Sequence, residues 1–155
     1  MFDQKKRELG KTISELELGD SISLVEKIND RELLLYLGLT NDANPLFLQH
    51  DYCQLTKFQR PIVPTTLLTG IVASAISKYL PGPGAHIVRQ RLEFPHVVHH
   101  YETLTFSLEV VKIDEKRNEA TIQVGVQNEE DIYVLTGTMI VAPPKPLAEE
   151  SEWAE

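Results

Sequence analysis

TTLLTGIVASAISKYL, residues 65–80, is the stretch of sequence that decides the fold. Apolar side chains recur in it with the i, i+1, i+4, i+5 spacing that gives a helix a wide apolar stripe. Polar side chains stay few and small until Ser77, so the pattern predicts a helix from Thr65 to Tyr79 that is buried on nearly all sides. Thr65 or Thr66 can cap its start. The stripe consists of Leu67, Leu68, Ile71, Val72, Ala75, Ile76 and Tyr79, and Ile71 and Ile76 are expected in the core.

The segments after this helix read as strands of an antiparallel sheet. Pro81-Gly-Pro-Gly84 ends the helix. Apolar and polar side chains then alternate, which is the period of a half-buried strand, and short charged or polar turns separate the runs. One buried helix followed by an antiparallel sheet predicts an α+β fold in which the sheet wraps round the helix. The expected strands are residues 86–94, 104–113, 119–127 and 132–141.

The residues before the helix are expected to add one strand and one short helix. Residues 21–27 read as the strand, and residues 29–39 as the helix, opened by the capping-box pair Asn29 and Glu32. Asn41 to Pro45 breaks that helix. A connecting segment follows, with a helical turn expected around Tyr52.

Length, charge and cysteine content limit the classes of function. A chain of 155 residues is one domain by length. The net charge of -8 argues against nucleic acid or an anionic membrane as the main partner. No signal peptide and no membrane-spanning stretch are read in the sequence, and the single Cys53 fits a reducing cytosol, so a cytoplasmic protein without a cofactor is expected. Residues 145–155 hold one Lys and four Glu and are expected to be a disordered acidic tail, with Trp153 its one candidate for docking.

Several motifs follow one another along residues 16–144: Leu16-Glu-Leu18-Gly19-Asp20, Asp42-Ala-Asn44-Pro45-Leu46, Tyr52, Phe58-Gln-Arg-Pro61-Ile62-Val63, Leu80-Pro-Gly-Pro-Gly84, and Thr136-Gly137-Thr138 with Ile140-Val141 and Pro143. In this order they resemble the MaoC-like hot-dog family, which includes (R)-specific enoyl-CoA hydratases and 3-hydroxyacyl-thioester dehydratases. The resemblance implies one hot-dog domain over residues 13–144, a curved antiparallel sheet round a long central helix. It also implies a homodimer with substrate tunnels near the interface, or a heterodimer with an active homologue.

The chemistry that the resemblance implies is addition of water to a 2-enoyl thioester carried by CoA or acyl carrier protein. In the family an Asp, and a His five residues later, hold one water and act as general base and acid. A backbone N–H at the start of the central helix, from a Gly that follows a second His, stabilises the thioester oxygen as negative charge develops.

The sequence keeps Asp42, Asn44 and Pro45 of this pattern but departs from it at two places. Phe47 stands where the family has the proton-transferring His, and Pro64-Thr65 stands where the family has His-Gly. Phe cannot transfer a proton, Pro has no N–H, and the Thr side chain crowds the approach that Gly permits. The candidate catalytic residues are therefore Asp42 and Thr65, and the candidate substrate-binding residues are Asn44, Phe47, Pro64 and Thr66.

Each candidate also has a purely structural interpretation. Asp42 and Asn44 follow a helix, where both residue types commonly form turns, and Asn44 is expected to tie the loop through side-chain hydrogen bonds. His50 could supply the missing group, although a solvent-facing loop position is the simpler interpretation. His96, His99 and His100 read as a polar loop or strand end. No metal site is expected there, because no Cys or carboxylate pattern accompanies the three histidines.

Three interpretations of function remain open from the sequence. The first is a hydratase or dehydratase of fatty-acid metabolism with altered or weak chemistry. The second is a subunit that binds acyl thioester or pairs with an active homologue and catalyses nothing. The third is a hot-dog thioesterase, for which Asp42 and the Thr65 end of the helix form a minimal set.

Overall fold

The structure, a computed structural model, describes residues 8–147 and contains four helices and five strands within that range. The helices are α1 (Asp30–Thr40), α2 (Pro45–Leu48), α3 (His50–Gln54) and α4 (Thr65–Lys78). The strands are β1 (Ser21–Lys27), β2 (His86–Glu93), β3 (Thr103–Asp114), β4 (Glu119–Gln127) and β5 (Tyr133–Ala142). The expected strands agree with these to within one residue at most ends, and the α+β prediction is confirmed.

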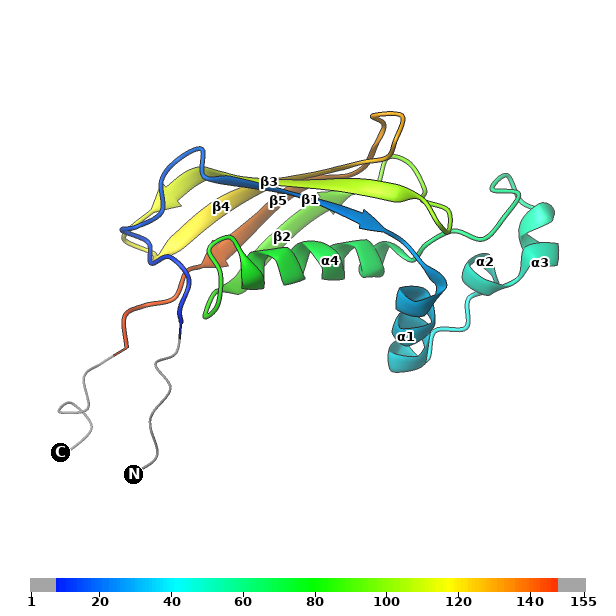
Figure 1. The fold of residues 1–155 in the computed structure, drawn as a ribbon, viewed down its shortest axis with the longest axis horizontal. Coiled ribbons are helices and arrows are strands. Elements are labelled where there is room, and N and C mark those ends of the chain that lie inside the picture. Colours follow the sequence, from blue (N-terminus) through cyan, green and yellow to red (C-terminus); the bar gives the residue numbers. More distant parts are fainter. Residues whose placement is uncertain (1–7, 148–155) are drawn as a thin grey trace, which may run out of the picture.

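The strands form one antiparallel sheet in the order β1-β3-β4-β5-β2, so β1 and β2 stand at its two ends. The sheet lies along one side of α4, and α1, α2 and α3 gather beyond the N-terminal end of α4 (Figure 1). Every second side chain is buried in β4 and in β3 as far as Val110, as the pleat of a strand covered on one face requires.

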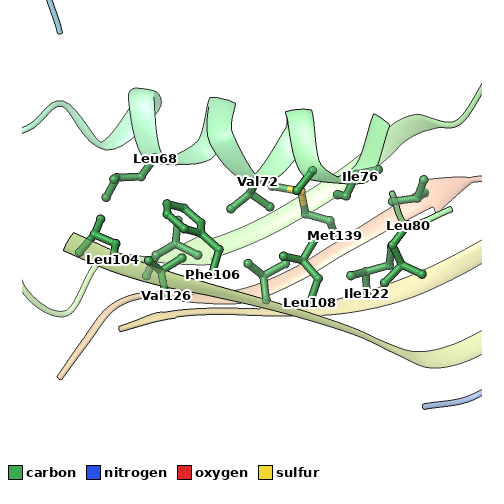
Figure 2. Packing of buried hydrophobic residues seen from close by; sticks show 14 of the residues in the cluster. Leu68, Val72, Ile76, Leu80, Leu104, Phe106, Leu108, Ile122, Val126 and Met139 are labelled. Carbon is green, nitrogen blue, oxygen red and sulfur yellow. The ribbon is translucent and has the colours of Figure 1, made fainter. Parts of the chain in front are cut away.

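The core lies between α4 and this sheet. Leu68, Val72 and Ile76 point from α4 toward the sheet (Figure 2), and each has at most 2% of its surface exposed. The strands contribute large, fully buried side chains to the same core. In Figure 2 these are Leu104, Phe106, Leu108, Ile122, Val126 and Met139. Packing of this kind, rather than helix propensity, holds a central helix in place.

The prediction that α4 is buried on nearly all sides is wrong for the single chain. Its buried residues are Leu68, Val72, Ala75 and Ile76, which share one face. On the other face Gly70 is exposed and Ile71 is only half-buried, and Tyr79, just past the helix end, is 55% exposed. Ile76 therefore lies in the core as expected, whereas Ile71 only packs against its edge. The reason is geometric, since one sheet covers one side of a helix.

The segment before α4 also differs in detail from the prediction. The Asn29 side chain makes no capping hydrogen bond at the start of α1, so the capping box with Glu32 does not form. The connecting segment holds two short helices, α2 and α3, of which α3 contains Tyr52. Residues 145–147 have no regular structure, and the rest of the expected acidic tail, including Trp153, lies outside the described residues. Within residues 8–147, no helix is long and apolar enough to cross a membrane.

Candidate functional site

The loop from α1 to α2 is shaped by the side chains of Asp42 and Asn44. Asp42 Oδ1 accepts a hydrogen bond from the Asn44 backbone N–H at 3.1 Å. Asn44 Oδ1 in turn accepts from the Leu46 N–H at 3.0 Å and caps α2, with Pro45 in the first turn. The expected loop-tying role of Asn44 is therefore present. One oxygen of the half-buried Asp42 carboxylate is engaged with backbone, which leaves the other oxygen for chemistry.

Phe47 lies on α2 and lines a cavity of about 360 Å³, here called the histidine cavity. The apolar part of its wall includes Leu33 and Leu34 of α1. Its polar part comes from Asp30, also in α1, and from more distant parts of the chain, namely His50, Arg60, His100 and Tyr101. Phe47 therefore stands at the wall of an open space and does not fill it.

The prediction that Thr65 or Thr66 caps the start of α4 is wrong, because the helix already begins at Thr65. Pro64 occupies the N-cap position and its side chain makes no capping hydrogen bond. Thr65 and Thr66 are exposed, and the Thr65 carbonyl accepts the Thr69 hydroxyl at 3.2 Å. The first N–H groups of a helix have no partner within the helix, so this end can still polarise an oxygen brought to it.

Thr66 lines a second cavity, of about 320 Å³, here called the α4 groove. The groove runs along the less buried face of α4, past Gly70, Ile71 and Ser74, and α1 closes it with Glu32 and Tyr36. The structure therefore separates the candidate residues. Phe47 belongs to the histidine cavity, Thr66 belongs to the α4 groove, and Asp42, Asn44, Pro64 and Thr65 line neither of the two.

The four histidines singled out from the sequence have different positions. His50 is exposed at the start of α3, as the simpler interpretation expects, but it also lines the histidine cavity. His96 is exposed, whereas His99 is tied down, with Nδ1 3.0 Å from the Pro61 carbonyl oxygen. Among the described residues there is no group of three or more His, Cys, Asp or Glu side chains placed to hold a metal ion.

His100 and Tyr101 meet Asp30 at the wall of the histidine cavity. The Tyr101 hydroxyl donates to Asp30 Oδ2 at 2.5 Å, and Asp30 Oδ1 lies 4.0 Å from His100 Nδ1. Burial lowers the pKa of His100, the Asp30 carboxylate opposes that change, and His50 adds to the lowering. The hydrogen bond to Asp30 raises the pKa of Tyr101. This cluster was missed in the sequence, where Asp30 reads only as an acidic residue in the first turn of a helix.

Comparison with known proteins agrees with the fold. Residues 11–132 match the family described as MaoC like domain. The (R)-specific enoyl-CoA hydratase of Aeromonas caviae is 29% identical over 129 residues, which are 83% of this chain and 96% of that protein. The enzyme of the same name from Rhodospirillum rubrum is 34% identical over 96 residues, 62% of this chain and 67% of that protein.

A solved structure gives the same result in three dimensions. The R-hydratase PhaJ1 from Pseudomonas aeruginosa, in its unliganded form, superposes with a TM-score of 0.80 at 29% sequence identity. The match covers 90% of this chain and 93% of that one. The hot-dog fold expected from the sequence motifs is thereby confirmed, and the chain belongs to the MaoC-like domain family of hydratases and dehydratases.

Proposed function

We propose that this protein binds 2-enoyl and 3-hydroxyacyl thioesters, carried by CoA or acyl carrier protein, and interconverts them only slowly. The observation that carries the proposal is Phe47, an apolar side chain at the wall of the histidine cavity where the family pattern has a proton-transferring His. The cavity keeps apolar side chains for an acyl group, among them Leu33 and Leu34, beside its polar ones. Fatty-acid metabolism is the setting that these substrates imply.

The slow rate follows from the groups that remain at the family positions. Asp42 has one oxygen occupied by the Asn44 N–H and has no partner at position 47 with which to share a water. Pro64 has no N–H, and Thr65 brings a side chain to the end of α4. Loss of one general acid or base usually costs about 100- to 10,000-fold in rate.

Substrate binding and hydration can be measured separately on the same preparation. We expect isothermal titration calorimetry to show binding of saturated butyryl-CoA or octanoyl-CoA. We expect hydration of crotonyl-CoA and octenoyl-CoA to be slow when followed by loss of the enoyl absorbance, with no release of free thiol. Absence of acyl-CoA binding would contradict the proposal, and thiol release without hydration would place the protein among the thioesterases.

A second candidate function is that of a subunit in an assembly. It is favoured by the half-exposed face of α4 and by β2, which ends the sheet and is exposed along most of its length. An unpaired strand edge and a partly apolar helix face are surfaces that a second hot-dog chain would cover.

We therefore expect a homodimer in sedimentation velocity at micromolar concentration. The expectation rests on the half-exposed face of α4 and on the edge of β2, because a second copy of the chain that covered both would leave no unpaired strand edge at β2. A monomer at that concentration would contradict it. Recovery of activity on mixing with an active homologue would instead support the role of a partner subunit.

A further inference from the structure

We infer that Arg60, in the lining of the histidine cavity, binds the phosphate group of the phosphopantetheine arm that carries the acyl thioester. The inference rests on the proposed function, because it takes the acyl thioester as the ligand of this cavity. It goes beyond that proposal by assigning a residue to the carrier and not to the acyl group. Three observations carry it: the place of Arg60 at the cavity, its free guanidinium group and the charge of the whole chain.

The histidine cavity joins an apolar part to a part that offers nitrogen atoms. Leu33 and Leu34 provide apolar surface, whereas Arg60, His50 and His100 carry the nitrogens. Arg60 and His50 are exposed, so a ligand can reach them from solvent. An apolar cavity with a few polar groups is typical of small-molecule sites. A ligand with an apolar acyl end and an anionic end matches this lining.

The backbone on both sides of Arg60 is held by hydrogen bonds. Gln59 has a φ of 67°, a left-handed conformation that is uncommon outside glycine. Its backbone N–H and its Nε2 both donate to the Thr56 carbonyl, at 3.3 and 3.1 Å. On the other side, the Ile62 N–H donates to the Leu46 carbonyl at 3.0 Å. Residues held in such conformations cluster at functional sites. The base of the Arg60 side chain is therefore fixed at the cavity.

The guanidinium group of Arg60 is available to a ligand. Within residues 8–147, Arg60 takes part in no ion pair. Asp30 is the one carboxylate in the lining of the cavity, and it is bonded to the Tyr101 hydroxyl. A guanidinium group presents a planar fork of N–H donors that matches two oxygens of a phosphate. Arg60 can therefore hold a phosphate without first giving up a carboxylate of the described chain.

The charge of the whole chain makes this local cation important. The net charge is -8, so the general field of the protein repels an anionic carrier. Salt screens that repulsion beyond about 10 Å, whereas a phosphate bound by Arg60 is in direct contact with the opposite charge. Among the described residues that line the cavity, Arg60 alone has a permanent positive charge. An anionic carrier is therefore held best at this residue.

Phosphopantetheine is the part that the two carriers share. In coenzyme A and in acyl carrier protein, the thioester stands at one end of the pantetheine arm and a phosphate ester at the other. With the acyl end against Leu33 and Leu34, the phosphate stays toward solvent, where the exposed Arg60 side chain can reach it. No bond is made or broken in this contact, so the inference concerns affinity.

The test compares R60Q with the matched control R117Q, using thioesters that differ only in the carrier. Arg117 is also exposed, but it lies in the turn between β3 and β4 and lines neither cavity. Three ligands are titrated by calorimetry: butyryl-pantetheine, which has no phosphate, butyryl-phosphopantetheine, which has one, and butyryl-CoA.

We expect R60Q to weaken binding of the two phosphorylated ligands by at least about fivefold at low salt, the upper range for a solvent-exposed ion pair. Binding of butyryl-pantetheine should stay within about twofold, because this ligand offers no charge to the pair. R117Q should change none of the three affinities. Circular dichroism and thermal unfolding check that R60Q is folded, which substitution of an exposed side chain should not prevent.

Two further measurements separate a phosphate contact from a structural role of Arg60. R60K keeps the charge but loses the planar fork, so its affinity for butyryl-phosphopantetheine should fall between those of the native protein and R60Q. Added salt should weaken binding of butyryl-phosphopantetheine to the native protein more than to R60Q, because salt screens the ion pair.

Four results would overturn the inference, and only the last also removes the proposed function. Unchanged affinities in R60Q would reject Arg60 as a ligand contact. Equal losses for butyryl-pantetheine and butyryl-phosphopantetheine would mean that Arg60 shapes the cavity and does not bind the phosphate. A loss for butyryl-CoA alone would move the contact to the nucleotide phosphates. Absence of binding of all three ligands to the native protein would remove the proposed function together with the inference.

Discussion

The triple variant F47H/P64H/T65G should hydrate crotonyl-CoA at least about 100-fold faster than the native protein. The first substitution returns to α2 a side chain that can share a water with Asp42. The other two remove the crowding Thr side chain from the start of α4 and give position 64 an N–H. Rates are measured by loss of the enoyl absorbance under identical conditions.

Partial restorations serve as the controls for this result. F47H alone should gain little, because the thioester oxygen would still meet Pro64 and Thr65 at the end of α4. D42N added to the triple variant should cancel the gain, since two groups are needed to hold the water. A triple variant no faster than the native protein, although folded and able to bind butyryl-CoA, would show that the departures at these three positions do not limit the rate.

Ile76→Ala should cost about 2–5 kcal/mol of unfolding free energy, the usual range for emptying a core position. Ile76 is 1% exposed and points from α4 into the core (Figure 2). Ile71→Ala removes the same atoms from the half-buried face and should cost about 1 kcal/mol, because less area is involved and no closed cavity remains. Urea unfolding of both variants measures the difference.

The comparison of these two variants also reports on assembly. Equal costs at the two positions would mean that the far face of α4 is covered as tightly as the near one. In a homodimer the second chain could provide that cover, and the cost of Ile71→Ala would then depend on protein concentration. A concentration-independent loss at Ile71 as large as that at Ile76 would contradict the packing described here.

The strands and α4 could be predicted because their signals are local. In β4, Ala120, Ile122, Val124 and Val126 alternate with polar residues or glycine. This alternation predicts both that the segment is a strand and which face of it is buried. The extent of burial of α4 could not be predicted in the same way. The stripe that contains Ile71 marks an apolar surface but does not say whether a sheet, another chain or a ligand covers it.

The candidate site could be predicted only where a motif carried it. Asp42, Asn44 and Phe47 stand in one short run, and the structure shows Asn44 tying the loop as expected. Asp30 and Tyr101 are 71 positions apart in the sequence, so no local motif or spacing predicts their contact. The Asn29 capping box shows the opposite case, a local pattern that the fold does not use.

Helix α1 forms a wall of both cavities, and this arrangement has a thermodynamic consequence. Its Asp30 and Leu33 face the histidine cavity, whereas Glu32 and Tyr36 face the α4 groove. A displacement of α1 that widens one space therefore alters the other. If the occupants of the groove and of the histidine cavity each bind one position of α1 more tightly than another, each must change the affinity for the other, and linkage requires the two effects to be equal.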